Sequence, residues 1–294
     1  MMFAIQAIVD GLLIGGVYAL VAMGLNLMFG VMGIVNFAQG EFLMIGMYIA
    51  LGFAGIAVPA ALLGVYWVVI PTVVIMAIVG MVFFVVMLDR AARFGESGQI
   101  LLTIGLSICL QGAAQVFQGS GNKLLRTPVY GEAIKIAGVI IGVPQLVAFC
   151  VAIAITLVMA WSVRYTFWGK TVRAVSDDTE AALALGINPK YVFIIATGVA
   201  IGLAGLAGGL LMPFHFTQPT VGQQFVVVAF LAIVIAGLGN VSGAVVGGLL
   251  LGVVQSVTAV YLSLDFSTAA MYVIFLLVLF LRPQGLLTRT ARTV

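Results

Sequence analysis

Residues 5–29 read IQAIVDGLLIGGVYALVAMGLNLMF, an apolar run of 25 residues in which Asp10 is the only charged residue. A helix of about 20 apolar residues crosses the ~30 Å hydrocarbon core of a bilayer, so this run is long enough to span a membrane. It lacks the alternation of apolar and polar residues that a membrane β-strand shows. The stretch therefore predicts a transmembrane α-helix.

Comparable apolar runs fill most of the remaining chain. They cover residues 34–58, 61–88, 100–118, 138–163, 191–212, 225–238, 241–262 and 268–281. Run 225–238 is too short for an easy crossing, so we expect a re-entrant half-helix or one broken unit with its successor. We therefore predict one all-α, polytopic transmembrane domain over residues 1–294, with eight or nine membrane segments that include broken or re-entrant helices.

The composition excludes several classes of protein. Of the 294 residues, 64% are apolar and 7% are charged, whereas a soluble domain has about 25% charged residues. The net charge is only +3 and no basic cluster with interleaved aromatic residues is present, so nucleic-acid binding is not indicated. Cys109 and Cys150 lie inside apolar runs and are interpreted as small hydrophobic residues. The expected environment is a lipid bilayer.

Glycine pairs with GxxxG spacing recur along the chain. They stand at residues 11 and 15, 198 and 202, 205 and 209, 243 and 247, and 248 and 252. This spacing stacks two glycines on one helix face and lets a neighbouring backbone approach closely. Because most of these pairs lie in the C-terminal half, we predict a tightly packed core there.

The lysines and arginines predict the orientation. Two lie in segment 89–99, four in segment 164–190 and three in the C-terminal tail, against three in the loop 119–137. If the crossings are as predicted, the first three groups share one side, which the positive-inside rule assigns to the cytoplasm. The side of the N-terminus stays open, because Asp10 is its only charge.

The first candidate site is the polar stretch NFAQGEF at residues 36–42. Asn36, Gln39 and Glu41 are costly in hydrocarbon unless they face a cavity or partners, and Gly33 and Gly40 favour a break in the helix. Broken helices with polar side chains can line a solute path. One interpretation is therefore a translocation path, and the other is a wet interfacial loop.

A second candidate is the joint GLGNVSG at residues 237–243, between two apolar halves. It either forms a functional break that adds Gly239 and Asn240 to the path, or it is a plain turn between spans. His215 follows Pro213 at a predicted membrane exit and is interpreted as an interfacial residue rather than a ligand.

The longest polar stretch, residues 166–190, reads TFWGKTVRAVSDDTEAALALGINPK. Asp178 and Glu180 are acidic residues typical of a first helical turn, and Gly186 is typical of a helix end. A short helix is therefore predicted from Asp178 to Gly186. Its apolar face, with Ala181, Ala182 and Leu185, suits insertion into a groove on another protein. The alternative is a helix on the membrane surface, which the acidic flank disfavours.

No catalytic machinery is visible in the sequence. The triplet GKT at residues 169–171 resembles the end of a phosphate-binding loop, but Arg164 stands where the first glycine belongs. We therefore predict that this chain has no ATP site, and neither a metal cluster nor a Ser/His/Asp arrangement is spaced for chemistry. An ion-driven secondary transporter would place a carboxylate at mid-membrane. We expect Asp10, Glu41 and Asp265 to lie near span ends instead.

Four segments in order resemble the permease subunits of bacterial ABC importers for branched-chain amino acids and related polar solutes. They are GIVNFAQGE (33–41), the stretch with Arg173, Asp178, Ala181, Ala182, Gly186 and Asn188, the joint GLGN (237–240) with Gly243, and RPQGL (282–286). Many members have His where this chain has Gln39. The family also includes carriers of urea, amides and other amino acids.

This resemblance implies a mechanism. Two permease subunits, identical or homologous, form the path across the bacterial inner membrane, and two cytoplasmic ATPases carry ATP and magnesium beneath them. A periplasmic binding protein delivers the solute, and the 178–186 helix couples the permease to the ATPase. The sequence thus predicts a transport subunit rather than an enzyme, with an ion-gradient-driven transporter as the alternative.

Overall fold

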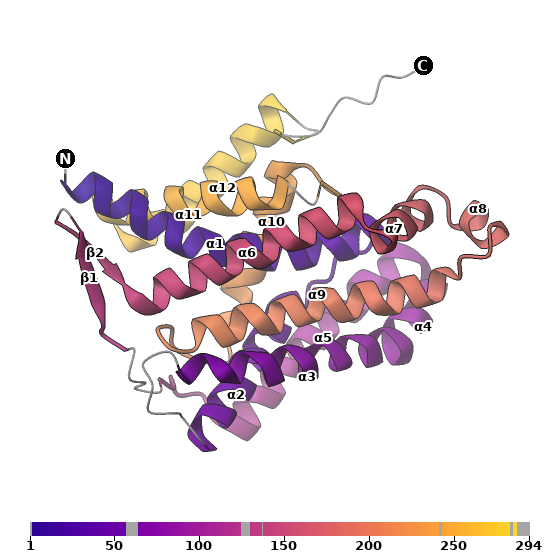
Figure 1. Cartoon of the computed structure of the whole chain (residues 1–294), viewed down its shortest axis with the longest axis horizontal. Coiled ribbons are helices and arrows are strands. Elements are labelled where there is room, and N and C mark those ends of the chain that lie inside the picture. Colours follow the sequence, from indigo (N-terminus) through magenta and orange to yellow (C-terminus); the bar gives the residue numbers. More distant parts are fainter. Residues whose placement is uncertain are drawn as a thin grey trace.

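A computed structural model describes residues 2–56, 64–124, 130–136, 138–240, 243–282 and 285–286. Arg126, Arg289 and Arg292, and Pro283 and Gln284 of the tail motif, lie outside the described residues. Twelve α-helices, labelled in Figure 1, make up most of what is described. This is the all-α architecture that the sequence predicts.

The helices follow one another with few strands between them. In chain order they are α1 (Met2–Met32), α2 (Gln39–Ile56), α3 (Val69–Phe83), α4 (Asp89–Ala91), α5 (Gly95–Gln118), α6 (Val143–Tyr165), α7 (Phe167–Asp177), α8 (Thr179–Ala184), α9 (Pro189–Leu211), α10 (Val221–Ala236), α11 (Gly243–Tyr261) and α12 (Leu264–Leu281). Strands β1 (Ala133–Ile136) and β2 (Val139–Gly142) form an antiparallel hairpin in which Ala133 pairs with Gly142. Short 3₁₀ turns at Gly64–Val68 and Ala92–Phe94, and a π turn at Phe84–Leu88, complete the list.

Seven helical segments among the described residues are long and apolar enough to cross a membrane. One of them, Gly64–Gln118, passes along the bundle twice. Val69 packs on Gly209 at the end of α9, whereas Asp89 pairs with Lys190 at its start. Lys123, just after α5, pairs with Thr217, just after α9. Gly64–Gln118 therefore counts as two of eight membrane segments, and the 16-residue helix α10 adds a shorter ninth. This agrees with the predicted eight or nine segments. The protein is a multi-pass membrane protein.

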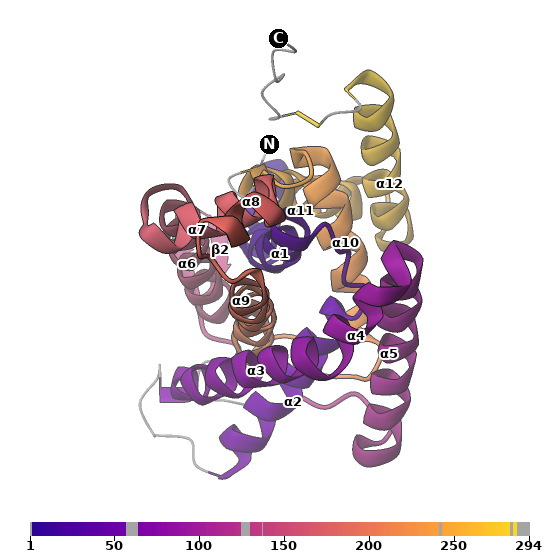
Figure 2. The same ribbon diagram turned by 90° about the vertical axis from the view of Figure 1, so that its right-hand side faces the viewer.

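Helices α1 and α9 form the centre of the bundle, as the end-on view of Figure 2 shows. In each of them 83% of the most apolar stretch is buried, compared with 17% in α6 and α12. On α5, Thr103 is the only buried residue. The outer helices therefore present apolar faces to lipid or to other subunits.

Glycines set the closest helix contacts. Gly11 and Gly15 of α1 face Gly248 and Gly252 of α11 so closely that a Cβ atom on any of the four would overlap the neighbouring backbone. On α9 the pairs at 198 and 202, and 205 and 209, face α3. The GxxxG prediction is confirmed, because small residues let these backbones meet.

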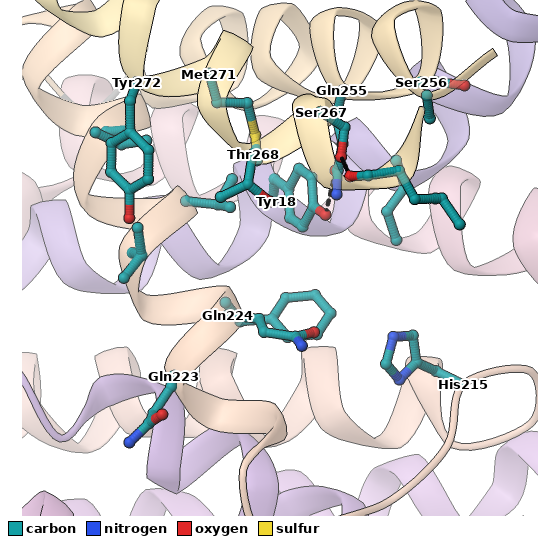
Figure 3. Close-up of a pocket in the computed structure, with 17 residues that line it drawn as sticks. Tyr18, His215, Gln223, Gln224, Gln255, Ser256, Ser267, Thr268, Met271 and Tyr272 are labelled. Carbon is teal, nitrogen blue, oxygen red and sulfur yellow. Dashed lines mark hydrogen bonds between the residues drawn. The ribbon is translucent and has the colours of Figure 1, made fainter. Parts of the chain in front are cut away.

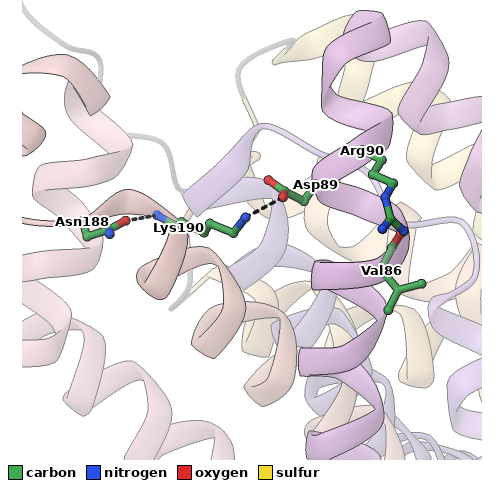
Figure 4. Close-up of polar contacts among 5 residues, drawn as sticks. All are labelled: Val86, Asp89, Arg90, Asn188 and Lys190. Carbon is green, nitrogen blue, oxygen red and sulfur yellow. Dashed lines mark hydrogen bonds and ion pairs between the residues drawn. The ribbon is translucent and has the colours of Figure 1, made fainter.

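The two ends of the bundle differ in charge. At the end that we call the basic end, Lys190 Nζ lies 2.7 Å from Asp89 Oδ2 (Figure 4), and Arg90 donates to the carbonyl of Val86. At the opposite end, the hairpin end, Gln6 Nε2 donates to the carbonyl of Ile140 at 2.8 Å. The positive-inside rule assigns the basic end to the cytoplasm. On this assignment the N-terminus, whose side the sequence left open, is placed on the outer side.

Candidate functional site

Helix α2 begins halfway across the bundle instead of at one end. Gln39 Nε2, in its first turn, donates to the carbonyl of Ala200 at 3.0 Å, and Ala200 is the central residue of α9. Glu41 Oε1 accepts from Ser107 Oγ at 2.7 Å, and Ser107 lies at the middle of α5. The expectation that Glu41 lies near a span end is therefore wrong. It failed because the chain folds back from the end of α1 before α2 starts.

Helix α10 begins at the same depth. Gly222 in its first turn lies against Gly40 in the first turn of α2, and a Cβ atom on either would overlap the backbone of the other. Two helix N-termini thus meet inside the bundle. Each carries a positive partial charge on its free N–H groups, which favours the carboxylate of Glu41 or an anionic group of a solute nearby.

The two broken units run in opposite directions. Ala50 and Ala54 of α2 pack with Met212 at the outer end of α9, so α2 leads to the hairpin end. The joint after α10 instead contacts α1 near its basic end, where Gly239 N donates to Asn26 Oδ1 at 2.8 Å. Units α1–α3 and α9–α11 therefore form an inverted pair, the arrangement that many transporters use to build a central site.

The side chains of the predicted break are fully enclosed. Asn36, Gln39 and Glu41 all have 0% exposure. Asn36 Oδ1 accepts from Ala38 N at 3.0 Å, while its amide donates to Gln39 Oε1 at 3.3 Å. Glu41 Oε2 has no hydrogen-bond partner among the described residues. The wet-loop interpretation of this stretch is wrong, because the return of the chain into the bundle covers it.

Gly239 and Asn240 lie elsewhere. Gly239 contacts Asn26 and Gly30 of α1, whereas Asn36 contacts Met28. Residues two positions apart lie on nearly opposite faces of a helix, so α1 separates the two parts of the predicted path. Gly239 and Asn240 instead border a cavity of about 880 Å³ at the basic end, together with Arg164 and Arg173.

The predicted coupling segment forms α7 and the short helix α8, which project from the basic end in Figure 1. Asp178 Oδ1 caps α8 by accepting from the N–H groups of Glu180 and Ala181, both at 2.9 Å. Gly186 ends the segment with a φ of +85°, a conformation that glycine adopts without strain. The start and stop signals are confirmed.

The apolar face of α8 is divided between two surfaces. Ala182 is 2% exposed and packs on the helical bundle beside Val172, Val175 and Ala196. Including Ala182 in a face offered to another protein was therefore wrong, since this side holds α8 to the bundle. Ala181 and the C-cap residue Leu185, four positions apart, share one exposed side of the segment, and Leu183 is exposed on the other side.

A cavity that the sequence reasoning missed opens between α1, α10, α11 and α12, and we call it the outer cavity (Figure 3). Its volume is about 610 Å³. Polar lining residues include Tyr18, His215, Gln223, Gln224, Gln255 and Ser256. The sequence does contain isolated glutamines, serines and threonines within apolar helices. They indicate a polar cavity only when it is known which helices are neighbours.

A smaller cavity of about 280 Å³ lies next to the outer cavity, and we call it the inner apolar cavity. Both are bordered by Val227, Leu231 and Tyr272. The inner apolar cavity is also lined by Asn36 and Phe37, so it lies between the outer cavity and the predicted break. Phe37 lies against Phe230, with ring centroids 6.3 Å apart.

No group of three or more His, Cys, Asp or Glu side chains that could hold a metal ion occurs among the described residues. Both Cys109 and Cys150 are free thiols. His215, expected at a membrane exit, lies just beyond α9 with its ring 5.6 Å from that of Phe225, and it borders the outer cavity.

Comparisons with known proteins agree on one family. Residues 7–281 match the family described as the branched-chain amino acid transport system permease component. The high-affinity branched-chain amino acid transport system permease protein LivH of Salmonella typhimurium is 30% identical over 98% of this chain and 96% of its own. The corresponding protein BraD of Pseudomonas aeruginosa is 31% identical over 97% and 96%. The ribose import permease protein RbsC of Bacillus subtilis is 26% identical over 55% and 52%.

No solved structure gives a comparable match. Permeases of ABC importers are transport subunits rather than enzymes, and they work with separate ATPase subunits and binding proteins. Given the match over nearly its whole length and its polytopic helical fold, the chain belongs to the family of branched-chain amino acid transport permease components and is the membrane-spanning subunit of an ABC importer.

Proposed function

We propose that this chain carries branched-chain or closely related amino acids across the bacterial inner membrane. Its path passes the mid-depth break formed by Asn36, Gln39, Gly40 and Glu41. The observation that supports this most is the meeting of the first turns of α2 and α10, where polar side chains lie buried at half depth. The names of the LivH and BraD relatives support the solute class.

The break has the chemistry that a passing zwitterion needs. Carboxamides offer both donors and acceptors, and the two helix N-termini favour a solute carboxylate. In the observed conformation Gln39 bonds to Asn36 and to α9, so the route is closed at this level. Opening requires α2 and α10 to separate, which would free these groups for a solute.

The driving force comes from partner subunits in this proposal. Two cytoplasmic ATPases bind ATP and magnesium, a second permease, identical or homologous, completes the path, and a periplasmic protein delivers the solute. The exposed side of α8 that carries Ala181 and the C-cap residue Leu185 enters a cleft of the ATPase. Helix α8 transmits motion to the bundle because Ala182 and α7 pack on α1 and α9. A change between states requires that nucleotide bind one state more tightly.

The test is uptake of leucine by the complete complex in proteoliposomes. We expect uptake to require ATP and the binding protein, and to persist when proton and sodium gradients are abolished. Uptake that continues without ATP and stops when an ion gradient is collapsed contradicts the proposal. That outcome would favour a secondary transporter, for which Glu41 at half depth is a suitable ion-binding group.

A further inference from the structure

The outer cavity offers polar groups on two opposing walls. On one wall Tyr18 Oη donates to Gln255 Oε1 at 2.6 Å, next to Ser267 and Thr268 of α12. On the other wall lie His215 and Gln224, which Figure 3 shows across open space from that pair. The two walls can thus hold two different polar groups of one small molecule.

None of the described residues that line the outer cavity is Asp, Glu, Lys or Arg. An ion that leaves water for such a site finds no opposite charge, which strongly disfavours a solute with a net charge. Neutral donors and acceptors can still satisfy a carboxylate and an ammonium of the same molecule. The cavity therefore selects solutes without net charge.

The wall formed by α10 favours the carboxylate. It presents the first-turn side chain of Gln224 to the cavity, whereas Val221 and Gly222 of the same turn are buried and do not line it. Gln224 is exposed, and its amide can donate to a carboxylate, whereas the amide of Gln223 donates to Gln111 Oε1 at 3.2 Å. The opposite wall favours an ammonium, because the hydroxyl of Ser267 already donates to the carbonyl of Leu264 at 2.6 Å and is left to accept.

Apolar side chains complete the lining. Ile14, Val228 and Met271 flank the polar groups, and Val227 and Leu231 separate the outer cavity from the inner apolar cavity. An aliphatic side chain would be removed from water here. A volume of about 610 Å³ lies within the usual range for small-molecule sites.

We propose that the outer cavity is a binding site for a zwitterionic amino acid with an aliphatic side chain. The carboxylate lies by Gln224, and the ammonium lies by Tyr18 and Gln255. The proposal rests on the proposed function and deepens it, since it places a solute-recognising site in the outer half of the permease, before the mid-depth break.

The first experiment measures protection from labelling, which reports on this site rather than on the binding protein. The full complex carries Ser256→Cys in a background with Cys109→Ala and Cys150→Ala, and a small water-soluble maleimide is the probe. We expect leucine and valine to slow labelling in a saturable way. Glutamate, lysine and ribose should not protect, because they carry a net charge or lack the two ionic groups.

Two glutamine variants locate the interaction. Gln255→Leu should raise the half-protecting leucine concentration roughly tenfold, as expected for a lost hydrogen bond to a charged group. Gln145→Leu is the matched control, since Gln145 is also half-buried near the hairpin end but lies outside the outer cavity. It should leave the leucine concentration unchanged.

A pair of opposite charges tests the orientation. At the exposed position 224, Gln224→Glu should weaken leucine protection by its repulsion of the carboxylate, whereas Gln224→Lys should preserve or strengthen it. If leucine protection is weakened equally in both variants, or more in Gln224→Lys than in Gln224→Glu, the proposed orientation of the solute is overturned. Equal protection by leucine, glutamate and ribose, or no effect of Gln255→Leu, would overturn the site. ATP-independent uptake would instead contradict the proposed function, so the failures are distinguishable.

Discussion

Substitution of Gln39 by leucine tests whether the mid-depth break serves transport or only packing. Leucine is similar in size but removes two contacts of a fully buried side chain: the bond to the Ala200 carbonyl at 3.0 Å and that from Asn36 at 3.3 Å. The Ala200 oxygen keeps its helical bond, so the main loss is the amide of Asn36, left facing only the sulfur of Met28.

The magnitude follows from this count. One buried donor that loses its partner costs about 1–3 kcal/mol, and in membrane bundles such terms fall near the lower end, about 1 kcal/mol. We therefore expect only a small loss of stability. Transport should suffer more, because an apolar side chain at the start of α2 raises the barrier for a zwitterion, and a barrier increase of about 1.4 kcal/mol slows uptake roughly tenfold.

The assay compares three quantities in Gln39→Leu, in the control Gln145→Leu and in the unmodified complex. These are the unfolding temperature in detergent, the amount of ATPase that co-purifies, and the initial rate of leucine uptake. We expect near-normal values of the first two and an uptake rate reduced about tenfold or more in Gln39→Leu alone. A normal uptake rate in this variant would refute the reasoning.

Cysteine accessibility provides an independent check of the same prediction. Single cysteines at positions 36, 39 and 41, in a background without Cys109 and Cys150, should resist a water-soluble thiol reagent in the observed conformation, where all three side chains are buried. If these residues line the path, the cysteines should become labelled when nucleotide changes the conformation of the complex. Labelling that is absent in every state, or high and independent of nucleotide, contradicts a role in the path.

Three further outcomes follow from other parts of the chain. Leu185→Arg, at the exposed C-cap of α8, should abolish stimulation of the ATPase by the loaded binding protein without lowering the unfolding temperature. Ala182→Arg should lower that temperature, because Ala182 is buried. The reverse pattern would show that α8 docks on the ATPase through the side that carries Ala182. Gly252→Leu should lower the free energy of unfolding by about 1–3 kcal/mol, since its side chain would overlap α1. Gly112→Leu, in open space on α5, should change it by less than about 0.5 kcal/mol. Equal melting curves for the two variants would contradict this packing. The purified chain alone should neither bind nor hydrolyse ATP, because no phosphate-binding loop is present in its sequence, and turnover above that of a mock preparation would disprove it.

The position of Glu41 changes how the alternative function is judged. The sequence placed this carboxylate near a span end, which spoke against an ion-driven transporter. The structure places it at half depth beside Ser107, so that argument no longer holds. What now supports ATP-driven import is the family match, together with a capped helix at the basic end that carries exposed leucines.

The residues alone determined the features that depend on local composition and spacing. Apolar runs of bilayer length predict helices whatever their neighbours, GxxxG pairs predict close contacts, and the uneven lysines and arginines predict the orientation. The ends of α8 belong to the same class, since Asp178 and Gly186 act within a few residues of themselves.

Only the tertiary structure decided where these elements meet. The depth of Glu41 depends on how far the chain returns after α1, and the separation of Gly239 from Asn36 depends on which face of α1 each one contacts. Ala182 and Leu185 are both apolar and close in sequence, yet the bundle covers one and leaves the other exposed. The outer cavity likewise exists only because α1 packs beside the distant helices α10, α11 and α12 and brings single polar residues together. Such contacts are long-range, and no local pattern encodes them.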